Sequence, residues 1–132
     1  SILRVNTLTD ASSNNSVPIA TVASGSAKAI GTIDTDTDNS IDFSFNIASY
    51  TDRATGSLYG NFTNNMGSAT GYTVLGSPSP VEPSTMGTSN SNRTIICSAD
   101  TAARFSSNGF SDSDNTMRDL NAHSNAVYGD LA

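Results

Sequence analysis

The amino-acid sequence predicts an all-β protein, a single antiparallel β-sandwich with an extended N-terminal arm. Two observations support this prediction. Short stretches of alternating or β-branched apolar residues recur about every ten residues, with turn-forming residues between them. No stretch shows the periodicity of a helix of useful length. The 132 residues suffice for one domain with a modest core, which we place at residues 27–132, after an arm at residues 1–26.

The composition is acidic and rich in small polar residues. The formal net charge is −6, and only 14% of the residues are charged. The six basic residues form no run, so the sequence lacks the basic stripe with which a nucleic-acid-binding protein neutralises phosphates. No apolar stretch approaches the roughly 18 residues that span a membrane, and the N-terminal segment has no signal-peptide pattern. We therefore expect neither nucleic acid nor a membrane as a partner.

Residues 40–63 give the strongest structural signal. The first half alternates polar residues with four apolar ones, Ile41, Phe43, Phe45 and Ile47. This period of two predicts a strand with one buried face. We expect a hairpin with a turn at residues 51–56, a positive φ at Gly56, and a second strand with an inner row of Leu58, Gly60 and Phe62. If Phe45 is buried in this way, the Phe45→Ala change should cost about 3–5 kcal/mol.

The remaining strands are shorter. Strand patterns occur at residues 2–8, 28–33, 71–76, 93–98, 102–106 and 126–128. Residues 17–23 contain Pro18, which cannot occupy a central strand, so we expect an edge strand or an extended arm there. Three prolines predict that residues 77–92 form no regular structure. Residues 107–126 are polar, and Met117 with Leu120 indicates either one turn of helix or a strand fragment.

The N-terminal segment holds few residues able to anchor a core. We expect residues 1–26 to pair with a partner subunit by strand addition. The alternative is that they form two edge strands of the same domain. The predicted partner-binding residues of the arm are Leu3, Val5, Leu8, Val17 and Ile19.

An acidic repeat at residues 34–39 raises the question of a cation site. Asp34, Asp36 and Asp38 stand at alternate positions, as in a calcium-binding loop. An EF-hand loop then requires glycine at its sixth position and glutamate at its twelfth, where this chain has Asn39 and Phe45. We favour a solvated acidic turn, with a cation site of another type as the alternative.

No residues form a recognisable catalytic or metal-binding motif. His123 has serine and aspartate neighbours in the sequence, but spacing alone does not establish a catalytic triad. Cys97 lies in a β-branched strand and is expected to be a small buried apolar residue. Tyr59 falls on the polar row of its strand, where it suits a protein or glycan contact, although tyrosine is also common at sheet edges. We therefore expect no enzyme activity, no metal and no cofactor.

The chain resembles a family of small virion structural proteins of marine tailed bacteriophages, including cyanophages. Residues 1–29, SILRVNTLTDASSNNSVPIATVASGSAKA, are similar to the opening of these proteins. Residues 43–66, FSFNIASYTDRATGSLYGNFTNNM, are similar to a segment of the family that runs from an aromatic residue and Asn through Thr-Asp and Thr-Gly to Asn-Phe-Thr. The final VYGDLA also matches. Arg53 stands where the family usually has Asn, and residues 30–33 lack the usual aromatic residue.

This resemblance implies a non-enzymatic structural component of the virion, assembled in the cytoplasm of the host bacterium. Our first hypothesis is a tail fibre or knob-like protein, a homotrimer whose loops touch the host surface. The alternative is a capsid decoration protein attached to the major capsid lattice through its N-terminal arm. In either case the expected partners are other phage virion proteins of the tail or capsid.

Overall fold

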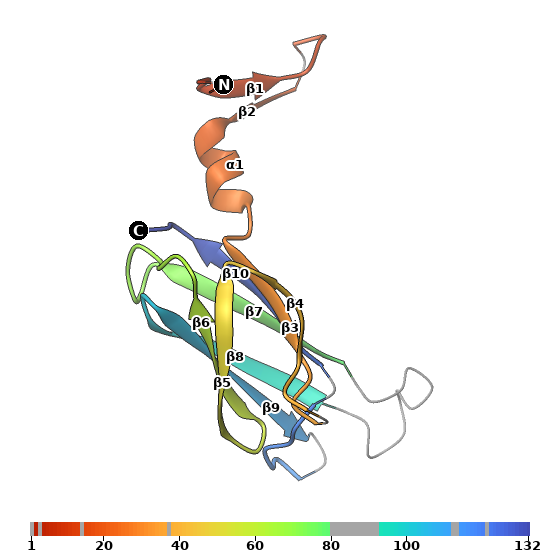
Figure 1. The fold of residues 1–132 in the computed structure, drawn as a ribbon. Helices are drawn as coiled ribbons and strands as arrows, with labels where there is room; N and C mark the ends of the chain where they lie inside the picture. Colours follow the sequence, from red (N-terminus) through yellow and green to blue (C-terminus); the bar gives the residue numbers. More distant parts are fainter. Residues whose placement is uncertain are drawn as a thin grey trace.

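Two four-stranded antiparallel sheets lie face to face and form the body of the protein (Figure 1). The structure is a computed structural model that describes residues 2, 4–13, 15–36, 38–79, 93–111, 114–120 and 122–132. The first sheet has the order β4-β3-β10-β7 and the second has the order β5-β6-β9-β8. The first consists of β3 (Ala29–Ile33), β4 (Ile41–Phe45), β7 (Tyr72–Ser79) and β10 (Ala122–Gly129). The second consists of β5 (Ile47–Ala54), β6 (Ser57–Phe62), β8 (Arg93–Thr101) and β9 (Arg104–Ser111). The predicted all-β sandwich is confirmed.

The segment before the sandwich contains a small hairpin and a helix. β1 (Thr7–Thr9) and β2 (Ser16–Pro18) pair with each other and with neither of the larger sheets. α1 (Ile19–Gly25) follows, and Figure 1 shows the hairpin and helix beyond the end of the sandwich. The expectation that residues 17–23 are extended is wrong from Ile19 onward. Pro18 stands at the helix N-cap, where its missing N–H costs no hydrogen bond. In the described part of the chain, no helix has the length and apolar character needed to cross a membrane.

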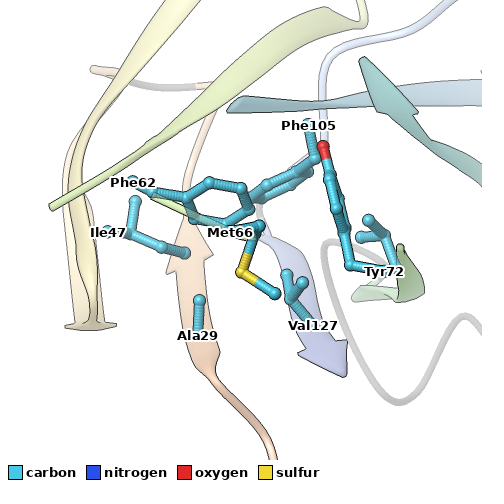
Figure 2. Close-up of a cluster of buried hydrophobic side chains, with 8 residues drawn as sticks. Ala29, Ile47, Phe62, Met66, Tyr72, Phe105 and Val127 are labelled. Carbon is cyan, nitrogen blue, oxygen red and sulfur yellow. The ribbon is translucent and has the colours of Figure 1, made fainter. Parts of the chain in front are cut away.

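Aromatic side chains from both sheets fill the space between them (Figure 2). The Phe62 ring lies 5.6 Å from the rings of both Phe105 and Tyr72, measured between centroids. Tyr72 also reaches across the sandwich, because its Oη lies 2.6 Å from the carbonyl oxygen of Arg104 and accepts a hydrogen bond from the Asp100 N–H. The buried cluster consists of Ala29, Ile47, Phe62, Met66, Tyr72, Val74, Phe105 and Val127. The two sheets are therefore joined by interlocking rings rather than by a hydrogen-bonded edge.

The predicted hairpin at residues 40–63 is wrong in its first strand. β4 pairs with β3 in one sheet, whereas β5 pairs with β6 in the other. Phe43 and Phe45 are 55% and 54% exposed, and only Ile47 of the expected apolar row is buried. The pattern correctly indicated a strand with one apolar face, but nothing in the described structure covers that face.

Asn46 separates β4 from β5. Its φ is 55°, in the left-handed region that asparagine tolerates better than most residues. Its side-chain amide donates hydrogen bonds to the carbonyl oxygens of Lys28 (3.0 Å) and Asn64 (3.2 Å), and its Oδ1 accepts from the Asn64 N–H at 2.7 Å. These bonds fix the point at which the chain passes from the first sheet to the second.

The second strand of the predicted hairpin is confirmed. Leu58 and Phe62 are buried in β6, and Gly60 lies directly under the Phe105 ring. Gly56 has the expected positive φ, 71°, although the turn is shorter than expected because β5 continues to Ala54.

Several other strand boundaries differ from the sequence prediction. β7 includes Pro78, which an edge strand tolerates because a missing N–H there interrupts no ladder. The rest of the proline-rich segment, residues 80–92, lies outside the described residues. β9 extends to Ser111 and β10 begins at Ala122, so much of the polar stretch 107–126 is strand. Met117 forms a bridge to Phe110, as the strand-fragment alternative predicts.

Candidate interaction surfaces

The predicted arm residues lie in the hairpin and at the start of the helix. Leu8 and Val17 face each other across the β1–β2 pair, beside a shallow depression of about 310 Å³. Val5 and Leu8 are exposed, Val17 and Ile19 are half-buried, and no residue of α1 is buried. Leu3 lies outside the described residues. The apolar side chains of this segment are thus available for contact, and its role as a docking arm stays a prediction.

A row of apolar residues crosses the outer face of the first sheet. The register aligns Phe45 with Ile30, Ile30 with Ala126, and Ala126 with Leu75. Directly paired residues project from the same face of a sheet, so these four side chains form one continuous stripe. Leu75 is 57% exposed, and Phe43 lies beside the row at 55%. We call Phe45, Ile30, Ala126 and Leu75 the apolar row.

The residues that pair with one another around the apolar row are uncharged, and Asp42 is the extra residue at the register shift of β4. Thr32 and Ser124 form the next pair across the same face, with their hydroxyl oxygens 3.1 Å apart. The described side chains on this face of the four strands are Ile30, Thr32, Phe43, Phe45, Thr73, Leu75, Ser77, Ala122, Ser124, Ala126 and Tyr128. In a chain of net charge −6, a second acidic protein would meet few carboxylates on this surface.

The acidic repeat forms a turn stabilised by its own carboxylates. Asp34 Oδ1 accepts a hydrogen bond from the Asp36 N–H at 2.9 Å, and Asp38 Oδ1 accepts from the Ser40 N–H at 3.0 Å. Hydrogen bonds from the hydroxyl and then the backbone of Ser40 lower the pKa of Asp38. Among the described residues, no group of three or more histidine, cysteine or acidic side chains could hold a metal ion. The described contacts are those of a turn closed by its own side chains.

A buried polar cluster surrounds His123. Its Nδ1 lies 3.3 Å from Ser107 Oγ, which also accepts a hydrogen bond from the Asn125 side-chain amide at 3.2 Å. The Cys97 thiol lies 3.5 Å from the same Oγ. Burial raises the pKa of Cys97 and lowers the pKa of His123 to about 4, so both side chains are neutral near pH 7. Ser107 and His123 are fully buried, which leaves no space for a substrate beside them.

The serine and aspartate neighbours of His123 in the sequence form no hydrogen bond with this cluster. Ser124 points to the opposite face, toward Thr32, and Asp119 Oδ1 accepts a hydrogen bond from the Gly56 N–H at 2.6 Å. The histidine instead meets Ser107, which sequence reasoning missed because the two lie on strands of opposite sheets. Cys97 faces the interior as expected, although it is half-buried and bonded to polar groups.

Tyr59 lies between two arginines on the outer face of the second sheet. The Arg53 Cζ is 4.5 Å and the Arg104 Cζ is 3.9 Å from the centre of the Tyr59 ring, both within range of a cation–π contact. Sequence reasoning singled out Tyr59 but neither arginine. Arg53 is close in sequence and across the β5–β6 hairpin, whereas the approach of Arg104 depends on the β6–β9 pairing, for which the sequence carries no local signal.

The face around Tyr59 is polar, in contrast to the apolar row of the first sheet. The register aligns Thr51 with Tyr59, Tyr59 with Ser106, and Ser106 with Ser98. Beside them, the Asn61 amide donates hydrogen bonds to the side-chain oxygens of Ser49 (3.1 Å) and Thr51 (2.9 Å). The two outer faces of the sandwich therefore suit different kinds of partner. Comparison of the chain with family models, curated proteins and solved structures gives no match.

Proposed function

We propose that the protein is a non-enzymatic structural component of a bacteriophage particle, a tail fibre or knob-like protein that assembles as a homotrimer. The observation that carries this proposal is the apolar row on the outer face of the first sheet. The similarity of residues 1–29 and 43–66 to marine phage virion proteins supplies the context. The proposed partners are further copies of this chain and other virion proteins.

The apolar row favours a second copy as its occupant. Most approaches between two chains of net charge −6 are repulsive, and contact through the uncharged paired residues of the first sheet reduces that repulsion. Burial of Phe45 and Leu75 against the two neighbouring copies around a threefold axis would stabilise the contact by the hydrophobic effect. Closed symmetry would then present several identical loops at the particle surface, where weak contacts with a host add together.

The mass of the full-length chain in solution tests this proposal. Light scattering on a sizing column should give three copies of the 13.6 kDa chain. A double variant, Phe43→Ser with Phe45→Ser, should reduce the mass to that of a monomer. Ile96→Ser is the matched control, since Ile96 is 55% exposed on the other sheet and its loss should leave the mass unchanged. A monomeric wild-type chain would contradict the trimer.

The alternative function is a capsid decoration protein, and the exposed hairpin and helix before β3 favour it. Such a protein would stay monomeric until its N-terminal segment pairs with the major capsid protein. Mixing the purified chain with capsids and labelling intact particles with an antibody would separate the two proposals. Label on the tail supports the fibre, label over the capsid supports decoration, and particles without label contradict both.

A further inference from the structure

The second sheet carries a local concentration of positive charge in an acidic protein. The chain has only six lysine and arginine residues, and two of them, Arg53 and Arg104, contact the same Tyr59 ring. Two guanidinium groups so close together repel each other unless an anion lies nearby. The fold nevertheless places both guanidinium groups against the Tyr59 ring, on the polar outer face of the second sheet.

Strand irregularities occur at Arg53 and beside the ion-pair partner of Arg104. The β5–β6 register shifts between Asp52 and Ala54, so Arg53 is the extra residue of a bulge, and bulges commonly redirect a side chain. A similar shift in β8 occurs between Ala99 and Thr101. The extra residue of this second shift is Asp100, the ion-pair partner of Arg104, whereas Arg104 itself pairs regularly with Asn61.

The two guanidinium groups differ in their partners. Arg104 Nε is held by Asp100 Oδ2 at 2.5 Å, an ion pair that orients the group over the tyrosine. Within the described part of the chain, Arg53 has no acidic partner, and the Tyr59 ring is its observed contact. Arg53 therefore has hydrogen-bond donors free for a ligand anion, while Arg104 is already oriented.

The neighbouring side chains suit a sugar. Ser49, Thr51 and Asn61 hold one another in place by side-chain hydrogen bonds beside the tyrosine. Hydroxyl and amide groups of this kind exchange hydrogen bonds with sugar hydroxyls, and an aromatic ring with a polar tip offers apolar contact to a sugar. Arginine adds a planar guanidinium group, whose parallel N–H donors can bind two oxygens of a carboxylate or sulfate group.

We propose that Arg53, Tyr59 and Arg104 form a binding site for an acidic polysaccharide, with a sulfate or carboxylate group at the two guanidinium groups. The site lies on the outer face of the second sheet, where an extended polymer can reach it. Because the net charge of the chain is −6, a polyanion should be attracted chiefly to this pair of arginines, and binding should weaken as ionic strength rises. This inference does not depend on the proposed assembly.

Titration calorimetry with dextran sulfate tests the site, with unmodified dextran as the neutral probe. Wild-type protein should bind dextran sulfate at low ionic strength and give no heat with dextran. The Arg53→Gln variant should bind about tenfold more weakly or worse, because it removes charged hydrogen-bond donors. Arg118→Gln is the matched control, since it removes the same charge from an exposed arginine paired with Asp114 and should retain wild-type affinity.

Two outcomes would overturn the inference. One is an equal loss of binding in Arg53→Gln and Arg118→Gln, which would indicate attraction to net charge alone. The other is no binding of dextran sulfate by the wild-type protein. Light scattering on Arg53→Gln separates this test from that of the proposed assembly, because the variant should keep the wild-type mass.

Discussion

Nδ1 of His123 lies 3.3 Å from Oγ of Ser107, and both side chains are fully buried between the two sheets. The other ring nitrogen, Nε2, is buried and has no hydrogen-bond partner among the described residues. An imidazolium at this position would place a charge in the interior without a counterion in contact. The histidine is therefore a source of acid sensitivity.

We predict that protonation of His123 destabilises the fold as the pH falls. Burial lowers its pKa to about 4, with Asp119 opposing this shift only in part, whereas the unfolded chain has the ordinary value of 6.5. The unfolded state thus binds more protons, so stability is full above pH 6.5 and decreases toward pH 4. The loss should be on the order of 3 kcal/mol by urea unfolding. His123→Gln should show a flatter dependence over this window, and an unchanged slope would contradict the assignment.

Truncation of two phenylalanines should lower the stability of the fold by very different amounts. Phe105→Ala should cost about 3–5 kcal/mol, because this ring is fully buried against Phe62. Phe45→Ala should cost less than about 1 kcal/mol in the monomer, because the side chain is 54% exposed. Urea unfolding at a concentration where the chain is monomeric measures both. A large loss for Phe45→Ala under those conditions would show that its face is covered within one chain.

A methyl group at Gly60 should be poorly tolerated. A Cβ there would overlap the Phe105 ring, so Gly60→Ala should cost about 1–3 kcal/mol as the core shifts to accommodate it. Gly25→Ala is the control, since a Cβ at that position meets no atom within 4 Å. Thermal unfolding of both variants checks the comparison, and equal midpoints would contradict the close approach of β6 to Phe105.

Removal of residues 1–26 should leave a folded sandwich. No residue of α1 is buried, and β1 is exposed along its length. The Lys28 N–H donates to the Val127 carbonyl oxygen at 2.7 Å, which marks the start of the first sheet. Calorimetry on the truncated chain should show one cooperative transition. A broad, non-cooperative transition would indicate that the N-terminal segment belongs to the core.

The alternation of apolar residues predicted strands well but did not determine their partners. Leu58 and Phe62 were correctly placed inside, since β6 lies in the middle of its sheet and one face is covered. Phe43 and Phe45 show the same alternation yet point outward. A period of two indicates one apolar face and contains no information on whether a layer of the same chain covers it.

The candidate sites depended on pairings between distant segments. Arg104 reaches Tyr59 through the β6–β9 ladder, and Ser107 meets His123 across the space between the sheets. Neither relationship leaves a pattern in the local sequence. The helix at residues 19–25 was missed for a different reason, because its β-branched residues and the preceding Pro18 resemble an edge strand.

The corner at Asn46 has a mechanical consequence. β4 and β5 belong to opposite sheets and are joined by this one residue, whose side chain is bonded to Lys28 and Asn64. A force that pulls on one sheet reaches the other through a connection of one residue, which cannot lengthen. Separation of the two sheets at this end would therefore require the hydrogen bonds of the Asn46 side chain to break.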